Sequence, residues 1–152
     1  MYKFMELDSK IVNLSKTATI IFNKRKRQVI FNFSNAINIL GRETSDFYIQ
    51  ELNTDYDFDK LKNKLLNIDF VKENFLIHES QNEIVNKNHI NTITFEPGKV
   101  NKIIFNLDFG VDVKDYKTGD IIKISKFVYW RFKEEDDMYD VYQEVKKEIL
   151  GE

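Results

Sequence analysis

The stretch that decides the fold runs from Ile90 to Phe132 and reads INTITFEPGKVNKIIFNLDFGVDVKDYKTGDIIKISKFVYWRF. Its apolar residues recur at every second position on either side of Pro97-Gly98: Ile93 and Phe95, on the same face as Asn91, before it, and Ile103, Phe105, Leu107 and Phe109 after it. Successive side chains of a strand point to opposite faces of a sheet, so this spacing predicts antiparallel strands with one apolar face. Asp115 to Asp120 is a turn by composition.

The last strand of this stretch, Ile121 to Phe132, carries aromatic residues on both faces. One face holds the residues Ile122, Ile124, Val128, Trp130 and Phe132. Lys126 interrupts that face, which indicates a β-bulge or a sheet edge. The other face holds Phe127, Tyr129 and Arg131, and tyrosine and arginine are enriched at interface hot spots. We therefore assign Trp130 to the core and expect Phe127, Tyr129 and Arg131 to contact a partner.

The remaining elements are predicted from local patterns. A hairpin is expected from Thr17–Phe22 and Gln28–Phe33, and a strand from Phe47 to Leu52. Helical spacing predicts a helix over 57–68 capped by Asp57, a short turn capped by Asp69 that carries Val71 and Phe75, and a helix from Asp136 to Leu150 that Gly151 ends. Ser34 could start another short helix ending at Gly41, and Glu79 to His89 is expected to be a polar loop. Together these elements predict an α+β fold with a mainly antiparallel sheet, a mid-chain helix and a C-terminal helix.

Length and composition limit the class of protein. The 152 residues (1–152) predict a single domain. Its strands could form one sheet or a two-layer sandwich. The net charge is −2, so no overall field attracts nucleic acid, and the chain has no cysteine for thiolate chemistry. The residues Met1 to Glu6 lack the apolar run of a signal peptide, and no stretch approaches the roughly 18 apolar residues of a membrane span. We expect a cytoplasmic protein without a membrane partner.

Three short motifs fail as chemical sites. His78-Glu79-Ser80 is similar to one half of a paired-histidine phosphoesterase motif, but His89 lies too near in the sequence to supply the second half. Asp55, Asp57 and Asp59 match the first ligands of a calcium loop, yet Lys60 and Leu66 stand where glycine and glutamate are needed. The acids Glu134 to Asp137 suit the start of a helix, although they could also act as a decoy for a basic groove. No catalytic residue, metal or cofactor is expected.

The four cations Lys24, Arg25, Lys26 and Arg27 form the sharpest charge feature of the chain. They lie between the two strands of the predicted hairpin, at its tip. Such a tip is commonly a solvated turn, but it could contact an acidic protein or the phosphates of nucleic acid.

These features favour a non-catalytic accessory protein that binds another protein. Residues with AT-rich codons are abundant, which indicates an AT-rich genome such as those of many low-GC bacteria and their phages. We expect an inhibitor or neutralising factor of the kind that phages and mobile elements encode, located in a host cytoplasm. The expected contact residues are Lys24 to Arg27 together with Phe127, Tyr129 and Arg131. One alternative is a self-associating structural subunit of a larger assembly such as a virion. Another is a nucleic-acid-binding protein that uses the basic tip.

Overall fold

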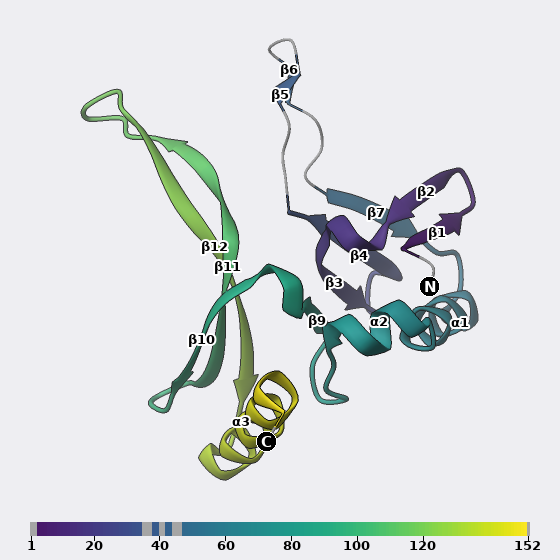
Figure 1. The fold of residues 1–152 in the computed structure, drawn as a ribbon. Coiled ribbons are helices and arrows are strands. Elements are labelled where there is room, and N and C mark those ends of the chain that lie inside the picture. The colour runs from purple at the N-terminus through teal and green to yellow at the C-terminus, as the bar shows by residue number, and fades with distance from the viewer. Residues whose placement is uncertain (1–2, 35–37, 40–41, 44–46, 152) are drawn as a thin grey trace. The chain divides into compact units, whose positions relative to one another are not determined.

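The computed structural model describes residues 3–34, 38–39, 42–43 and 47–151, with the backbone only at 38–39, 42–43, 111–113 and 123–124. The fold is α+β with mainly antiparallel sheets, a mid-chain helix and a C-terminal helix, as the sequence predicts (Figure 1). Residue contacts divide the chain into two compact units, Met1–Asn88 and His89–Glu152. Each unit is described by itself. The single domain expected from the chain length stays a prediction, because such a division does not show whether either unit folds alone.

The first unit contains a five-stranded antiparallel sheet in the order β7-β4-β3-β9-β8 and two small two-stranded sheets, β1-β2 and β5-β6. Its elements are β1 (Phe4–Leu7), β2 (Lys10–Asn13), the 3₁₀ turn η1 (Leu14–Lys16), β3 (Thr17–Asn23), β4 (Gln28–Phe33), β5 (Asn38–Ile39), β6 (Arg42–Glu43), β7 (Phe47–Glu51), α1 (Asp55–Leu66), α2 (Asp69–Asn74), β8 (Phe75–Leu76) and β9 (Glu83–Asn86). The predicted hairpin is confirmed as β3–β4, and the predicted strand at 47–52 is confirmed as β7.

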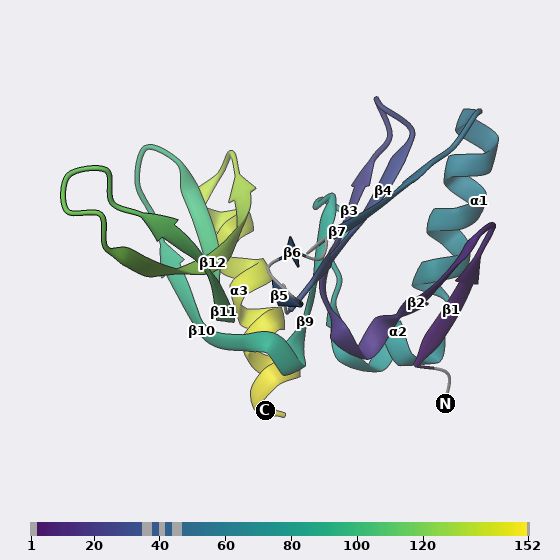
Figure 2. The same ribbon diagram turned by 90° about the horizontal axis from the view of Figure 1, so that it is seen from above.

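The core of this unit lies between one face of the five-stranded sheet and the two helices, which lie on the same side of it (Figure 2). Strand register aligns Ile20 with Phe31 and with Ile84, so these buried side chains form a row across three strands. Phe58 and Leu65 of α1 are buried in the same cluster. The strands β1 and β2 contribute further buried side chains to it, namely Met5, Leu7 and Val12.

Four local predictions in this unit are wrong. The segment Glu79–His89 is not all loop, because β9 pairs with β3 and β8. Thr54, not Asp57, caps α1: its side chain accepts a hydrogen bond from the Asp57 backbone N–H at 3.0 Å. Asp69 is the first residue of α2 and makes no cap. The short helix between Ser34 and Gly41 is replaced at 38–39 by β5, while 35–37 and 40–41 lie outside the described residues.

The second unit is a three-stranded antiparallel sheet in the order β10-β11-β12 with one helix. After the 3₁₀ turn η2 (Lys87–His89), which spans the boundary between the units, come β10 (Ile90–Glu96), β11 (Asn101–Lys114), β12 (Ile121–Phe132) and α3 (Glu135–Leu150). The register of β11 on β12 shifts between Asn106 and Gly110, opposite Lys126. The irregularity and the edge position that Lys126 indicated are therefore both found.

The core of the second unit forms between the sheet and α3. Trp130 is 1% exposed and packs edge-to-face on Phe105 with ring centroids 4.8 Å apart. The ring of Phe95 in β10 packs on the ring of Tyr142 in α3, with centroids 5.1 Å apart. The helix buries three apolar residues that recur at helical spacing: Met138, Val141 and Val145. Gly151 ends it with a φ of 73°, and its N–H donates to the Lys147 carbonyl, as a left-handed cap requires.

Beyond Ile90, the first residue of β10, the strands β11 and β12 continue as a two-stranded arm, defined here as residues 108–126 (Figure 1). The turn at its tip closes where the Asp115 N–H donates to the Asp120 carbonyl at 2.8 Å. Gly119 has a φ of 77°, which other residues rarely adopt. Tyr116 at this tip is 98% exposed and Ile121 is 73% exposed.

Two alanine substitutions test which side chains of β11 and β12 lie on the core side of the sheet and which lie on the other side. Phe105→Ala should lower the free energy of unfolding by about 3–5 kcal/mol because it opens a cavity beside Trp130. Phe127→Ala should change it by less than about 1 kcal/mol, since Phe127 is 49% exposed. The single tryptophan, Trp130, reports unfolding of this unit by fluorescence in urea. Equal losses in the two variants would contradict the described register.

Candidate functional site

The candidate contact surface is the sheet face of the second unit that points away from α3. We call it the outer face and define it by Phe127, Tyr129 and Arg131 of β12 with Lys102 and Ile104 of β11. Cross-strand register pairs Ile104 with Tyr129 and Lys102 with Arg131. Val128 and Trp130 occupy the core side. The residues that alternate with them along the strand, Phe127, Tyr129 and Arg131, therefore point to the outer side. The three predicted partner-contact residues of β12 thus share one face.

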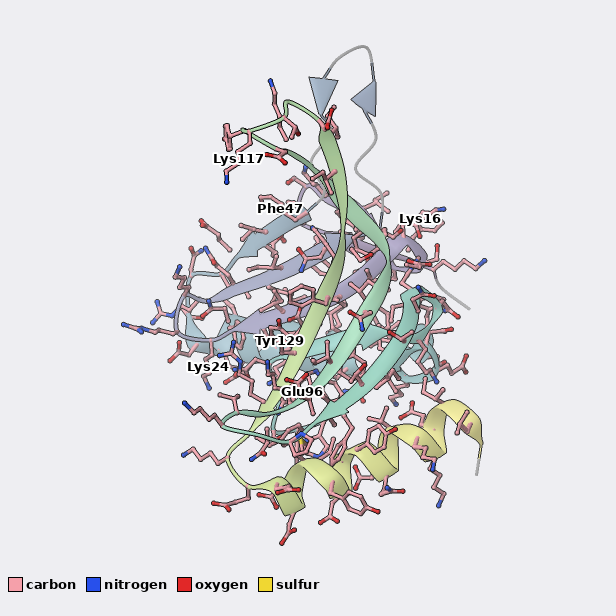
Figure 3. All side chains as sticks on the ribbon, turned by 90° about the vertical axis from the view of Figure 1, so that its left-hand side faces the viewer. Lys16, Lys24, Phe47, Glu96, Lys117 and Tyr129 are labelled. Carbon is pink, nitrogen blue, oxygen red and sulfur yellow. The ribbon has the colours of Figure 1, made fainter. Side chains whose placement is uncertain are left out.

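The outer face combines aromatic rings with cations. The rings of Phe127 and Tyr129 lie 4.8 Å apart. The Lys102 ammonium lies 4.9 Å, and the Arg131 guanidinium 5.8 Å, from the centre of the Tyr129 ring (Tyr129 and Glu96 are labelled in Figure 3). Lys102 also lies 3.8 Å from a Glu96 carboxylate oxygen. This arrangement can hold apolar side chains and carboxylates.

The sequence patterns did not assign Lys102 and Ile104 to the candidate surface. A signal for them existed, because Ile104 stands among polar residues on the face expected to be outward. An isolated apolar residue at such a position does not by itself distinguish contact from chance. It becomes informative when the register places it beside Tyr129.

The basic tip, Lys24 to Arg27, lies between β3 and β4 and faces acids of α1. The Lys24 ammonium is 3.3 Å from an Asp59 carboxylate oxygen, and the Arg27 Nε donates to Asp55 at 2.9 Å. All four side chains of these pairs are largely exposed, so each pair contributes little to stability. The pairs nevertheless offset two of the four cations. Arg25 and Lys26 are exposed and stay candidates for contact.

The carboxylates that resemble a calcium loop are thus engaged in a different way. Asp55 and Asp59 each pair with a cation of the tip, and Asp57 lies in the first turn of α1. Acids at the start of a helix complement its dipole. Among the residues that the structure describes, no three His, Asp or Glu side chains group to hold a metal ion.

The two histidines belong to different units and have different neighbours. In the first unit, Nδ1 of His78 accepts a hydrogen bond from the Ser80 N–H at 3.2 Å and lies 2.7 Å from the Ser80 hydroxyl. These bonds close a local turn of three residues. In the second unit, Nδ1 of His89 lies 3.5 Å from an Asp108 carboxylate oxygen, and Asp108 is about half exposed.

Glu83 is a partly buried acid on β9 that the sequence analysis placed in a loop. Burial raises the pKa of its carboxyl above the usual value, and the hydrogen bond with Thr19 lowers that pKa by a smaller amount. The register places Glu83 opposite Ile21 of β3. An apolar neighbour of this kind disfavours the charged form of the acid.

The raised pKa of Glu83 makes a prediction about pH. The folded state holds the Glu83 proton more tightly than the unfolded state does. The protonated carboxyl therefore favours the folded state fully below the unfolded pKa, and this contribution to stability is lost as pH rises through the folded pKa. Glu83→Gln should therefore raise the melting temperature at pH 7, and the gain should shrink toward pH ~4. Thermal melts followed by circular dichroism measure the change in melting temperature at each pH. Glu79→Gln, at an exposed site, is the control and should show no such trend; a loss of stability in Glu83→Gln at pH 7 would contradict the prediction.

A surface depression of about 610 Å³ lies in the first unit between the turn after β1, the end of β7 and α1. Its lining includes charges of both signs: Glu6, Asp8, Glu51, Asp57, Lys60 and Lys64. It contains no residue of the outer face or of the basic tip, and its mixed charge indicates no class of ligand.

Comparison of the chain with protein-family models, curated protein sequences and solved structures gives no match. Within the described residues, no helix has the length and apolar character needed to cross a membrane.

Proposed function

We propose that the protein is a non-catalytic factor that binds another protein through the outer face. The observation that carries this proposal is the exposed cluster on β12, where Phe127 is half exposed beside Tyr129 and two cations flank the tyrosine ring. The opposite side of the same strand is buried in the core, so these aromatic residues are additional to those that pack against α3.

The composition of the outer face suits a binding hot spot. Tyrosine and arginine often dominate the binding free energy when a partner excludes water from them. The Tyr129 ring is already held by its neighbours Phe127 and Lys102, so little side-chain entropy remains to be lost on binding. A partner that covers this cluster would bury apolar ring surface and place acceptors near Arg131.

Capture from a lysate of the organism that carries the gene tests the proposal. Wild-type protein should retain a partner, and Tyr129→Ala should weaken its binding by at least about tenfold if Tyr129 belongs to a hot spot. Tyr116→Ala is the matched control, because Tyr116 is a fully exposed tyrosine of the same unit at the tip of the arm. Calorimetric titration with the purified partner gives the dissociation constant of each variant relative to that of the wild type.

Two outcomes contradict the proposal. One is a folded wild-type protein that retains no partner. The other is a partner that binds wild type, Tyr129→Ala and Phe127→Ser with equal affinity. An inhibitory or neutralising role, of the kind encoded by phages, is the finer form of the proposal. It requires that the captured partner loses its own activity when the protein is bound.

A structural subunit is a second candidate, and the arm favours it. A two-stranded ribbon is only marginally stable in water, and this one exposes Tyr116, Ile121 and Ile122. Residues 108–126 contain four Asp and four Lys, so charge does not oppose contact between arms of identical subunits. Repeated contacts of this kind build assemblies.

Light scattering after size-exclusion chromatography tests the second candidate. A subunit should give a multimer, and Ile121→Glu should reduce its mass to that of a monomer because a charge enters the exposed apolar patch of the arm. Lys117→Glu changes the charge at the tip and should leave the mass unchanged. A monomer at all protein concentrations contradicts the subunit role and leaves the protein-binding proposal standing.

A further inference from the structure

We propose that the partner supplies an extended acidic segment that adds as a fourth strand along the edge of β12. This inference rests on the proposed protein-binding function and names the chemistry of the partner. It is carried by two observations: the position of β12 at the end of its sheet and the charge of its sequence.

The sheet order β10-β11-β12 gives β12 a hydrogen-bonded neighbour within this sheet on one side, namely β11. The strand has 12 residues and contains neither proline nor glycine, so every residue along this long edge has a backbone N–H. The opposite edge, β10, has seven residues and is followed by Pro97. A long edge strand is a template on which another extended segment can pair.

The charge of β12 selects the kind of segment. From Ile121 to Lys133 the chain has four basic residues and no acidic one, although the whole protein has a net charge of −2. A second copy of β12 laid along this edge would place cations against cations, which opposes self-pairing. An acidic segment would place carboxylates against the same cations. Lysines on an edge thus disfavour self-association while they favour an acidic partner.

The outer face fixes the pattern of that segment. An added strand continues the alternation of the sheet, so every second residue of it would lie beside the outer-face residues of β12. Carboxylates at those positions would approach Arg131, and the aliphatic part of a glutamate would cover the Phe127 and Tyr129 rings. The predicted partner segment is therefore extended, with acidic residues at every second position.

A synthetic peptide tests this on the full-length protein. The probe is a fluorescently labelled, end-blocked peptide of about ten residues in which valine and glutamate alternate. Its binding is measured by fluorescence anisotropy. We expect saturable binding that weakens as salt rises from ~50 mM to ~500 mM. Arg131→Glu should weaken binding about tenfold, whereas Lys117→Glu, the same reversal of charge in the turn outside the strand, should not.

Backbone methylation of the probe separates strand addition from ordinary contact. Methylation of alternate amide nitrogens removes the donors that pair with an edge and keeps every side chain, so binding should be lost. Three results overturn the inference: no binding of the parent peptide at millimolar concentration, equal binding of the methylated peptide, or displacement of the peptide by an oligothymidylate, which would indicate single-stranded nucleic acid instead. A partner captured through Tyr129 that resists competition by the peptide would also overturn it, while leaving the proposed function intact.

Discussion

Alternation along β12 is the constraint on which the second unit depends. The core requires Trp130 against Phe105, and this contact sets the facing of each neighbouring position on the strand. A register slip of one residue would bury Arg131 and expose Trp130, at a large cost in free energy. The outer face is therefore fixed as firmly as the core, although its own side chains contribute little to folding.

The two basic stretches of the chain are balanced by different means. At the tip of β3–β4, carboxylates of α1 offset Lys24 and Arg27 through long-range pairs. Along β12, aromatic rings lie beside the cations: Tyr129 beside Arg131 and Phe109 beside Lys126, at 5.8 Å in both cases. A ring attracts a cation without neutralising its charge, so these contacts position Arg131 and Lys126 and leave each with its formal charge.

The sequence was sufficient wherever a pattern extended over several residues. The alternation at Ile103 and Phe105 and the helical stripe at Val141 and Val145 predicted elements that are found, because burial on one face repeats with the period of the element. The strand β9 was missed because its apolar run is only Ile84-Val85. Polar residues around it have structural roles that no local pattern reveals: the buried Asn86 amide, for example, donates to the Thr17 carbonyl, 69 positions away.

The same distinction applies to the candidate site. Phe127, Tyr129 and Arg131 could be assigned to one face from the sequence, since only the period of a strand was needed. Their neighbours Lys102 and Ile104 required the register of β11 on β12, and that register includes a shift opposite Lys126. A bulge of this kind changes which residues face one another without changing the local composition. The cross-strand half of a sheet surface therefore depends on pairing, and pairing depends on contacts that a single strand does not encode.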